Sequence, residues 1–207
     1  MHVVRTVSTT LLLLGSLNLA AAQGRAYEDF VFGDSPQTVA DKLVQHSDIR
    51  FGGIVPLTEL GFATPSLLLN SELLIATIDD VWFTLHFQFF DAKLYRVTLE
   101  SVPLPASAIA STVETRMTQL RNMVSATQGE PDIRVAVGPE DTQSGSVVWS
   151  DVWTTDQDGV AYFIGMGQDA SQYFAALWIQ WTWLKNLRDQ STGKAIPDDT
   201  ERAVHDF

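Results

Sequence analysis

The chain of 207 residues contains no cysteine. Disulfide bonds, thiolate nucleophiles and cysteine-rich zinc sites are therefore excluded. The fold must be held together by the burial of ordinary apolar side chains.

Basic residues are also scarce. The chain has 13 Lys and Arg against 25 Asp and Glu, which gives a net charge of −12. Such a negative field repels nucleic acid and anionic lipid, so we expect no nucleic-acid partner. It would tolerate cationic partners or divalent ions, but a scattered negative surface usually serves solubility.

The common catalytic and cofactor motifs are missing. The chain has no Gly-x-Ser-x-Gly elbow, phosphate loop, dinucleotide fingerprint or His-Glu-x-x-His sequence. Beyond the N-terminal segment the histidines are His46, His86 and His205, which are far apart and share no metal-ligand spacing. We therefore predict no catalytic residue set, no cofactor and no metal site.

The run DQDG, which begins at Asp156, resembles part of a calcium-binding loop. Aligning Gly159 with the glycine of that loop places Thr154 at the first ligand position and Gly165 where a bidentate glutamate is required. The run is therefore interpreted as a turn.

A long apolar run occurs only near the start of the chain. Residues 1–22 combine Arg5, the run LLLLGSLNLA and three alanines ending at Ala22. This pattern is typical of a signal peptide cleaved before Gln23, and a retained signal anchor is the alternative. The run is short for a membrane span, which needs about 20 residues. We expect a secreted or periplasmic bacterial envelope protein that is soluble after cleavage, without lipid attachment or an integral membrane segment.

The remaining chain predicts one α+β domain over residues 23–184 and a polar C-terminal tail over residues 185–207. Its sheet should be mostly antiparallel, as two meanders, with one short and one long helix packed on one face. Because the order helix then strands occurs twice, two related halves, residues 30–102 and 105–184, are an open alternative.

The stretch FVFGDSPQTV begins at Phe30, and its segment Phe32–Ser35 resembles the nucleophile block of the GDSL hydrolases. That family also has an asparagine in a Gly-x-Asn-Asp block and a histidine three residues after an aspartate, and both are absent here. Its parallel sheet also differs from the antiparallel hairpins expected here. We interpret Ser35 instead as the N-cap of a helix that starts at Pro36 and ends near His46. Residues 49–65, rich in glycine and proline, are expected to form a loop.

The stretch from Val81 to Ser101 carries a strong strand signal. Alternation places Phe83, Leu85, Phe87 and Phe89 on one face of the first strand, and Tyr95, Val97 and Leu99 on one face of the second. These faces meet only across a loop of odd length, so we predict the loop Asp91-Ala92-Lys93 and the pairs Phe89–Tyr95 and Phe87–Val97.

The opposite face of this hairpin combines polar and aromatic side chains. We predict that it is a binding surface for a protein or glycan partner, and a plain solvated sheet face is the alternative. The predicted binding residues are Trp82, His86, Gln88, Arg96 and Glu100.

The second half of the chain predicts a long helix from Pro105 to Gln128, a short strand IRVAV, and strands from Val147 to Leu184. A two-residue turn at Asp158-Gly159 would place Trp149 and Trp153 on one face with Tyr162, Ile164 and Met166. In the last strand, one face should carry Tyr173, Ala175, Leu177, Ile179, Trp181 and Trp183. We expect the tryptophans of these stripes to lie in the core.

This plan of a short helix, a helix ending in GEP at residues 129–131, and tryptophan-bearing antiparallel strands resembles small bacterial envelope proteins of the BamE and β-lactamase-inhibitor type. The resemblance implies a sheet whose open face holds a protein partner. The lipoprotein cysteine of one family and the disulfides of the other are absent, so neither activity is carried over. Two functions follow: a non-catalytic envelope protein that binds a protein or glycan through a sheet face, or a secreted, esterase-like hydrolase with an unrecognised site.

Overall fold

The computed structural model of the chain describes residues 25–53, 55–57, 69, 73–155, 159–182 and 185–186. The predicted signal peptide and nearly all of the predicted tail lie outside these residues. None of the helices within them has the length and apolar character needed to cross a membrane. The fold is α+β with mostly antiparallel strands, as predicted.

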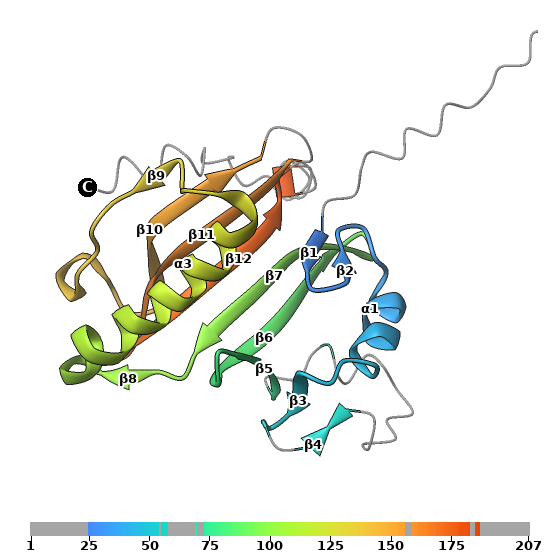
Figure 1. The fold of residues 1–207 in the computed structure, drawn as a ribbon, viewed down its shortest axis with the longest axis horizontal. Helices are drawn as coiled ribbons and strands as arrows, with labels where there is room; N and C mark the ends of the chain where they lie inside the picture. Colours follow the sequence, from blue (N-terminus) through green and yellow to red (C-terminus); the bar gives the residue numbers. More distant parts are fainter. Residues whose placement is uncertain are drawn as a thin grey trace, which may run out of the picture.

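A ten-stranded antiparallel sheet dominates the described residues (Figure 1). The first part of the chain supplies β3 (Ile49–Phe51), β4 (Val55–Pro56), β5 (Leu74–Ile78), β6 (Val81–Phe90) and β7 (Lys93–Ser101). The second supplies β8 (Leu104–Pro105), β9 (Ile133–Arg134), β10 (Ser146–Thr154), β11 (Val160–Asp169) and β12 (Gln172–Trp181). The order is β4-β3-β5-β6-β7-β12-β11-β10-β9, with β8 paired to the start of β12, so the two parts join where β7 meets β12.

The helices pack on one side of this sheet. The short helix α1 spans Pro36–Leu43, and the long helix α3 spans Glu114–Gln128. A 3₁₀ turn (Ala106–Ala108) and a π-helical turn (Ile109–Val113) lead into α3, and a further 3₁₀ turn (Pro139–Asp141) lies in a loop. In Figure 1, α3 crosses β11 and β12, and a small hairpin of β1 (Arg25–Tyr27) and β2 (Phe30–Val31) lies by β7.

The core lies between these helices and the sheet. It buries residues from both helices and from one face of the central strands, among them Val39, Leu43, Phe83, Leu85, Val97, Leu99, Leu120, Ile164, Leu177 and Ile179. The opposite sheet face is therefore the one that the described helices leave uncovered.

Ser35 caps α1 as predicted. Its Oγ accepts a hydrogen bond from the Thr38 backbone N–H at 3.1 Å, and Pro36 occupies the first helical turn. The helix ends at Leu43, slightly before the predicted end.

The expectation of a loop over residues 49–65 is wrong at its start. Ile49 to Phe51 form β3, which pairs with β5, and Ile49 is buried in the core. A strand of three residues is too short to show alternation, so tertiary pairing alone defines it.

The β6–β7 hairpin has the predicted faces but a different turn. Phe87 pairs with Val97 as predicted, whereas Phe89 pairs with Leu94. The loop consists of two residues, Asp91 and Ala92, both at positive φ, and the register shifts past Gln88 so that Tyr95 is the extra residue. A bulge shifts register by one residue, so it restores the pairing that the two-residue turn would otherwise break.

Trp149 does not share a face with Trp153, contrary to prediction. Trp153 pairs with Tyr162 and is buried in the main core. A register shift between Trp149 and Asp151 turns Trp149 to the other face, where it packs with Phe163. The sequence pattern carries no clear signal for this bulge.

The remaining predictions for this half are confirmed in part: the core stripe of β12 is as predicted, whereas the strand predicted at IRVAV is limited to Ile133–Arg134 and the turn before β11 is longer than two residues. From Tyr173 to Trp181, the predicted stripe of β12 packs in or against the core, and Trp183 lies outside the described residues. Asp158 also lies outside them. The Thr155 backbone N–H bonds to the Val160 carbonyl at 2.9 Å, so this connection is longer than two residues but keeps the predicted even length.

Candidate functional site

The sheet face opposite the helices gathers all five predicted binding residues. Across β6 and β7, Thr84 pairs with Glu100, His86 with Thr98 and Gln88 with Arg96. On the far side of β7, residues of β12 continue the same face. We call this surface the open face and define it by Trp82, Thr84, His86, Gln88, Arg96, Thr98, Glu100, Phe174, Ala176, Trp178 and Gln180.

A groove of about 570 Å³ lies on the open face. Thr84, His86 and Glu100 line it from β6 and β7, and Phe174 and Trp178 line it from β12. Asp169, at the end of β11, is also in the lining. None of the described residues that line the groove is Lys or Arg.

Glu100 is the most perturbed acid of this groove. Burial raises the pKa of its carboxyl above the usual range, and the nearby His86 partly opposes that rise. A carboxyl whose charge is poorly solvated binds a hydrogen-bond donor more strongly than an exposed one does.

Two polar atoms beneath the groove lack partners. Within the described part of the chain, neither Thr98 Oγ1 nor Trp178 Nε1 makes a hydrogen bond, and both atoms are buried. Thr98 lies between His86 and Trp178, because it pairs with each of them across the sheet. Leaving a buried polar atom unpaired costs about 1–3 kcal/mol, so the fold is less stable here than it would be with apolar side chains.

Arg96 lies under this surface and supports it. The side chain is buried and donates from Nε and Nη2 to Gln180 Oε1, at 3.1 and 2.7 Å. Its guanidinium stacks on the Trp178 ring at 4.1 Å from the ring centre. We therefore assign Arg96 to the positioning of Trp178, not to direct contact with a partner.

The Gln88 side chain also makes its contact within the protein. Its Oε1 accepts a hydrogen bond from the Tyr95 hydroxyl at 2.9 Å. Gln88 is thus tied to the bulge of β7, outside the residues that line the groove.

Two aromatic rings of the open face lie directly on glycines. A Cβ at Gly167 would come within 2.2 Å of the Phe174 ring, and one at Gly53 would come within 3.0 Å of the Trp82 ring. Glycine thus allows both rings to lie close against the backbone. Trp82 nevertheless remains 49% exposed.

Trp82 borders a second, smaller hollow. This hollow has a volume of about 270 Å³ and is lined also by Asp48, Arg50 and Thr77. Trp82 and the groove residue Thr84 are two positions apart on β6, so they point to the same face about 7 Å apart. The second hollow therefore borders the same sheet face as the groove.

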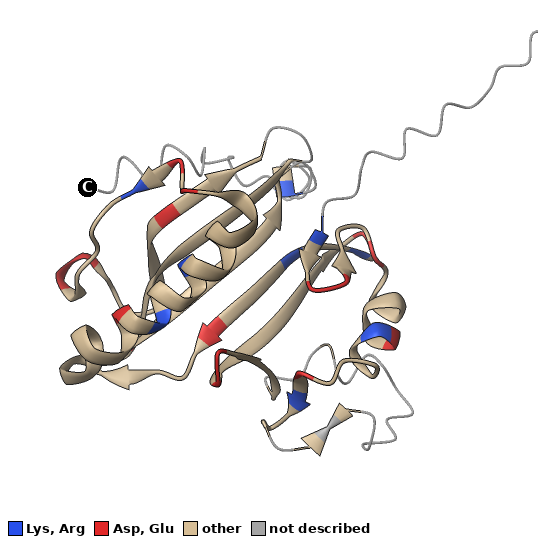
Figure 2. Cartoon of the chain, in the orientation of Figure 1, with Lys and Arg blue, Asp and Glu red and all other residues tan. Residues whose placement is uncertain are grey.

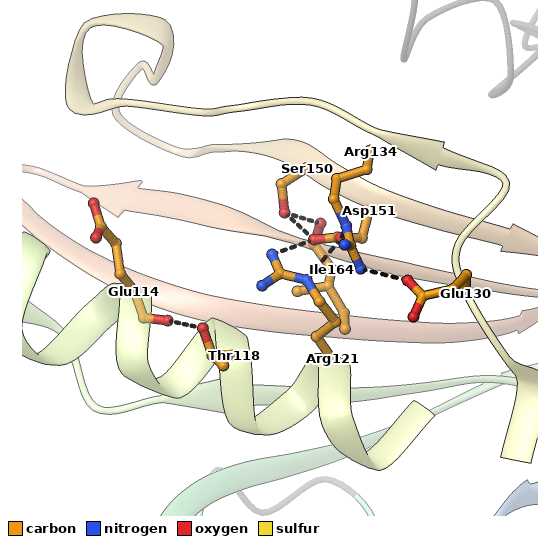
Figure 3. A network of polar contacts seen from close by, with 8 residues as sticks. All are labelled: Glu114, Thr118, Arg121, Glu130, Arg134, Ser150, Asp151 and Ile164. Atoms are coloured by element: carbon orange, nitrogen blue, oxygen red, sulfur yellow. Dashed lines mark hydrogen bonds and ion pairs between the residues drawn. The ribbon is translucent and has the colours of Figure 1, made fainter. Parts of the chain in front are cut away.

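A buried ion network on the helix side was not predicted from the sequence (Figure 3). Asp151 is fully buried and accepts two hydrogen bonds from Arg121 of α3, at 2.8 and 2.7 Å. Arg134 and Ser150 donate to the same carboxylate, at 3.0 and 2.7 Å. Burial alone would raise the pKa of Asp151, but these hydrogen bonds and the Arg121 charge hold it below the usual range. The arrangement attaches α3 to β10, and its satisfied geometry indicates a structural role.

No group of three or more potential metal-ligating side chains occurs among the described residues. His46 bonds to Asp29 at 2.7 Å and stacks on Phe30, whose ring packs against Phe87 in the helix-side core, whereas His86 lines the groove on the opposite face. His205 and Asp156 lie outside the described residues. Figure 2 shows the acidic residues spread over turns and element ends, consistent with a dispersed negative surface.

Comparison of the chain with models of known protein families, with curated proteins and with solved structures finds no match.

Proposed function

We propose that this protein is exported to the bacterial envelope and binds a protein or glycan partner there without catalysis, through the open face. The observation that carries the proposal is the groove on the uncovered side of the sheet, with unpaired polar atoms directly beneath it. A purely structural sheet face would be expected to satisfy such atoms. The resemblance to small bacterial envelope proteins, which implies an open sheet face that holds a protein partner, agrees with this proposal.

A secreted hydrolase is the second candidate. The observation that favours it is the raised pKa of Glu100 next to His86, because groups with shifted pKa values often serve as acids or bases. Its esterase form is weakened by Ser35, whose hydroxyl accepts the Thr38 N–H and contacts the Thr38 side chain. Release of product from a broad set of ester and glycoside substrates, lost in Glu100→Gln, would favour this candidate over binding.

The proposal is tested by capture from an envelope extract on the immobilised mature chain. We expect Trp82→Ala to reduce capture at least about fivefold, since exposed tryptophans often anchor interfaces, while the melting temperature stays near that of the unchanged protein. Val102→Ala is the matched control, because Val102 is similarly exposed but, unlike its neighbours Ser101 and Pro103, does not line the groove.

Treating the extract with protease or with periodate then distinguishes a protein partner from a glycan. Equal capture by the unchanged protein, Trp82→Ala and Glu100→Gln would show that the open face is an ordinary solvated surface.

A further inference from the structure

The groove presents a particular set of hydrogen-bonding groups. The carboxylates of Glu100 and Asp169 are acceptors, whereas the Thr84 hydroxyl and the His86 ring can each donate and accept. The Trp178 N–H can only donate, and it has no acceptor among the described residues. A complementary ligand must therefore supply both donors and acceptors at short spacing.

Charge narrows the class of ligand further. The two carboxylates, with no Lys or Arg in the described lining, repel phosphate, sulfate and uronate groups. A simple ammonium group would satisfy the carboxylates but offers no acceptor to the donors of Thr84 and His86. The hydroxyl groups of a ligand can pair with every donor and acceptor of the groove, since each hydroxyl both donates and accepts hydrogen bonds.

The aromatic rings add an apolar surface. The Phe174 ring lies over Gly167, and Phe174 lines the groove from β12 two residues before Ala176, the partner of Glu100 in β7. An aromatic ring that lines a groove can pack against the C–H face of a sugar. The second hollow also combines an aromatic ring with polar groups, since Trp82 lies there with Asp48, Thr77 and the cationic Arg50.

From these observations we propose that the open face binds a neutral oligosaccharide, with one sugar in the Phe174–Trp178 groove and a further part of the chain at Trp82. This inference rests on the proposed binding function and specifies its ligand. Because Trp82 of the second hollow and Thr84 of the groove lie about 7 Å apart on one face of β6, longer oligosaccharides should reach both hollows and bind more tightly than single sugars.

The test is isothermal titration of the mature protein with neutral gluco-, xylo- and N-acetylglucosamine oligomers, from monomer to hexamer. Oligogalacturonate and a lysine-rich peptide serve as anionic and cationic comparators. We expect at least one neutral series to bind, with an affinity that rises about tenfold or more between monomer and tetramer as the second hollow is filled. The anionic series should not bind.

Variants assign that binding to the groove. Trp178→Phe should weaken it about fivefold or more by replacing the indole that lines the groove with a smaller ring. Its control is Trp153→Phe, which loses an N–H bonded to the Gly129 carbonyl in the core and should bind normally. Trp82→Ala should abolish the gain in affinity from chain length.

Two outcomes overturn the inference. Binding of the lysine-rich peptide in preference to every neutral oligomer would indicate a cationic partner. Absence of oligosaccharide binding, together with envelope capture that still depends on Trp82, would indicate a protein partner. Either result would contradict the oligosaccharide inference but leave the proposed binding function of the open face in place. Capture that does not depend on the open face would contradict both the inference and the proposed function.

Discussion

At the scale of single residues, the fold distinguishes polar groups that stabilise it from those that do not. The Ser35 hydroxyl accepts a backbone N–H at the start of α1. The Thr98 hydroxyl is as deeply placed as a core group but has no partner among the described residues. Replacing these two hydroxyls should therefore change stability in opposite directions.

For Ser35, alanine removes the cap and leaves a helix N–H unpaired. We expect Ser35→Ala to lower the free energy of unfolding by about 1 kcal/mol, and Ser35→Asp to be nearly neutral because aspartate also caps well. Urea unfolding of the three proteins measures both effects. Covalent labelling of Ser35 by a fluorophosphonate would contradict its structural assignment and favour the hydrolase.

For Thr98, valine has a similar shape and no hydroxyl. We expect Thr98→Val to raise the free energy of unfolding by about 1 kcal/mol, because it removes a buried group that lacks a hydrogen bond. Thr142→Val is the control: Thr142 is also buried, but its hydroxyl donates to the Pro139 carbonyl at 2.9 Å, so this variant should be less stable. Equal destabilisation by both changes would show that Thr98 is satisfied in solution.

At the scale of elements, the ion network around Asp151 fixes the position of α3 against β10. The folded state lowers the pKa of Asp151, so this carboxylate stabilises the fold above its unfolded pKa of about 4. That contribution is lost as pH falls through the lower, folded pKa. Asp151→Asn should therefore be clearly destabilised near neutral pH, by about 3 kcal/mol or more, since Arg121 loses its buried partner.

Melting curves recorded from neutral to acidic pH test the sign of this effect. The gap in stability between the unchanged protein and Asp151→Asn should narrow as the pH is lowered below about 4. Glu114→Gln, an exposed change on the same helix, controls for the general effect of acid. A gap that does not vary with pH would show that Asp151 contributes through its shape and not its charge.

The strands also show which features of the fold the sequence predicts and which it does not. Alternation in β6 and β7 predicted which side chains share the open face, because a period of two is unambiguous over nine or ten residues. It did not predict the bulges at Tyr95 and next to Trp149, since a bulge depends on pairing with a partner strand. The Asp151 network was missed for the same reason: its partner Arg121 is brought to it only by the packing of α3.

The groove likewise could be predicted only in part. The five predicted binding residues do share one face, but Arg96 is buried and Gln88 is bonded to Tyr95. The other wall comes from β12, where Phe174 and Trp178 follow the ordinary apolar pattern of a strand. Their position beside Glu100 depends on the pairing of β7 with β12, which no local pattern in the sequence specifies.

At the scale of the whole molecule, the strand order is nearly symmetric about the β7–β12 pair. From this centre, β6, β5 and β3 follow on one side, and β11, β10 and β9 follow on the other. Each set is preceded in the chain by a helix, so two related halves, residues 30–102 and 105–184, stay an open alternative. The groove takes residues from both, so neither half alone would bind the ligand.

Export is the remaining whole-molecule prediction, and it concerns residues outside the described structure. The small side chains of Ala20 and Ala22 fit the −3 and −1 positions of a signal-peptidase site. We expect expression in a bacterial host to yield an envelope protein whose intact mass corresponds to a start at Gln23. Ala22→Tyr should block this cleavage, whereas Ala21→Tyr should not, because the position between the two small residues is unrestricted. A full-length product in the membrane fraction, unaffected by either change, would identify a retained anchor and contradict cleavage.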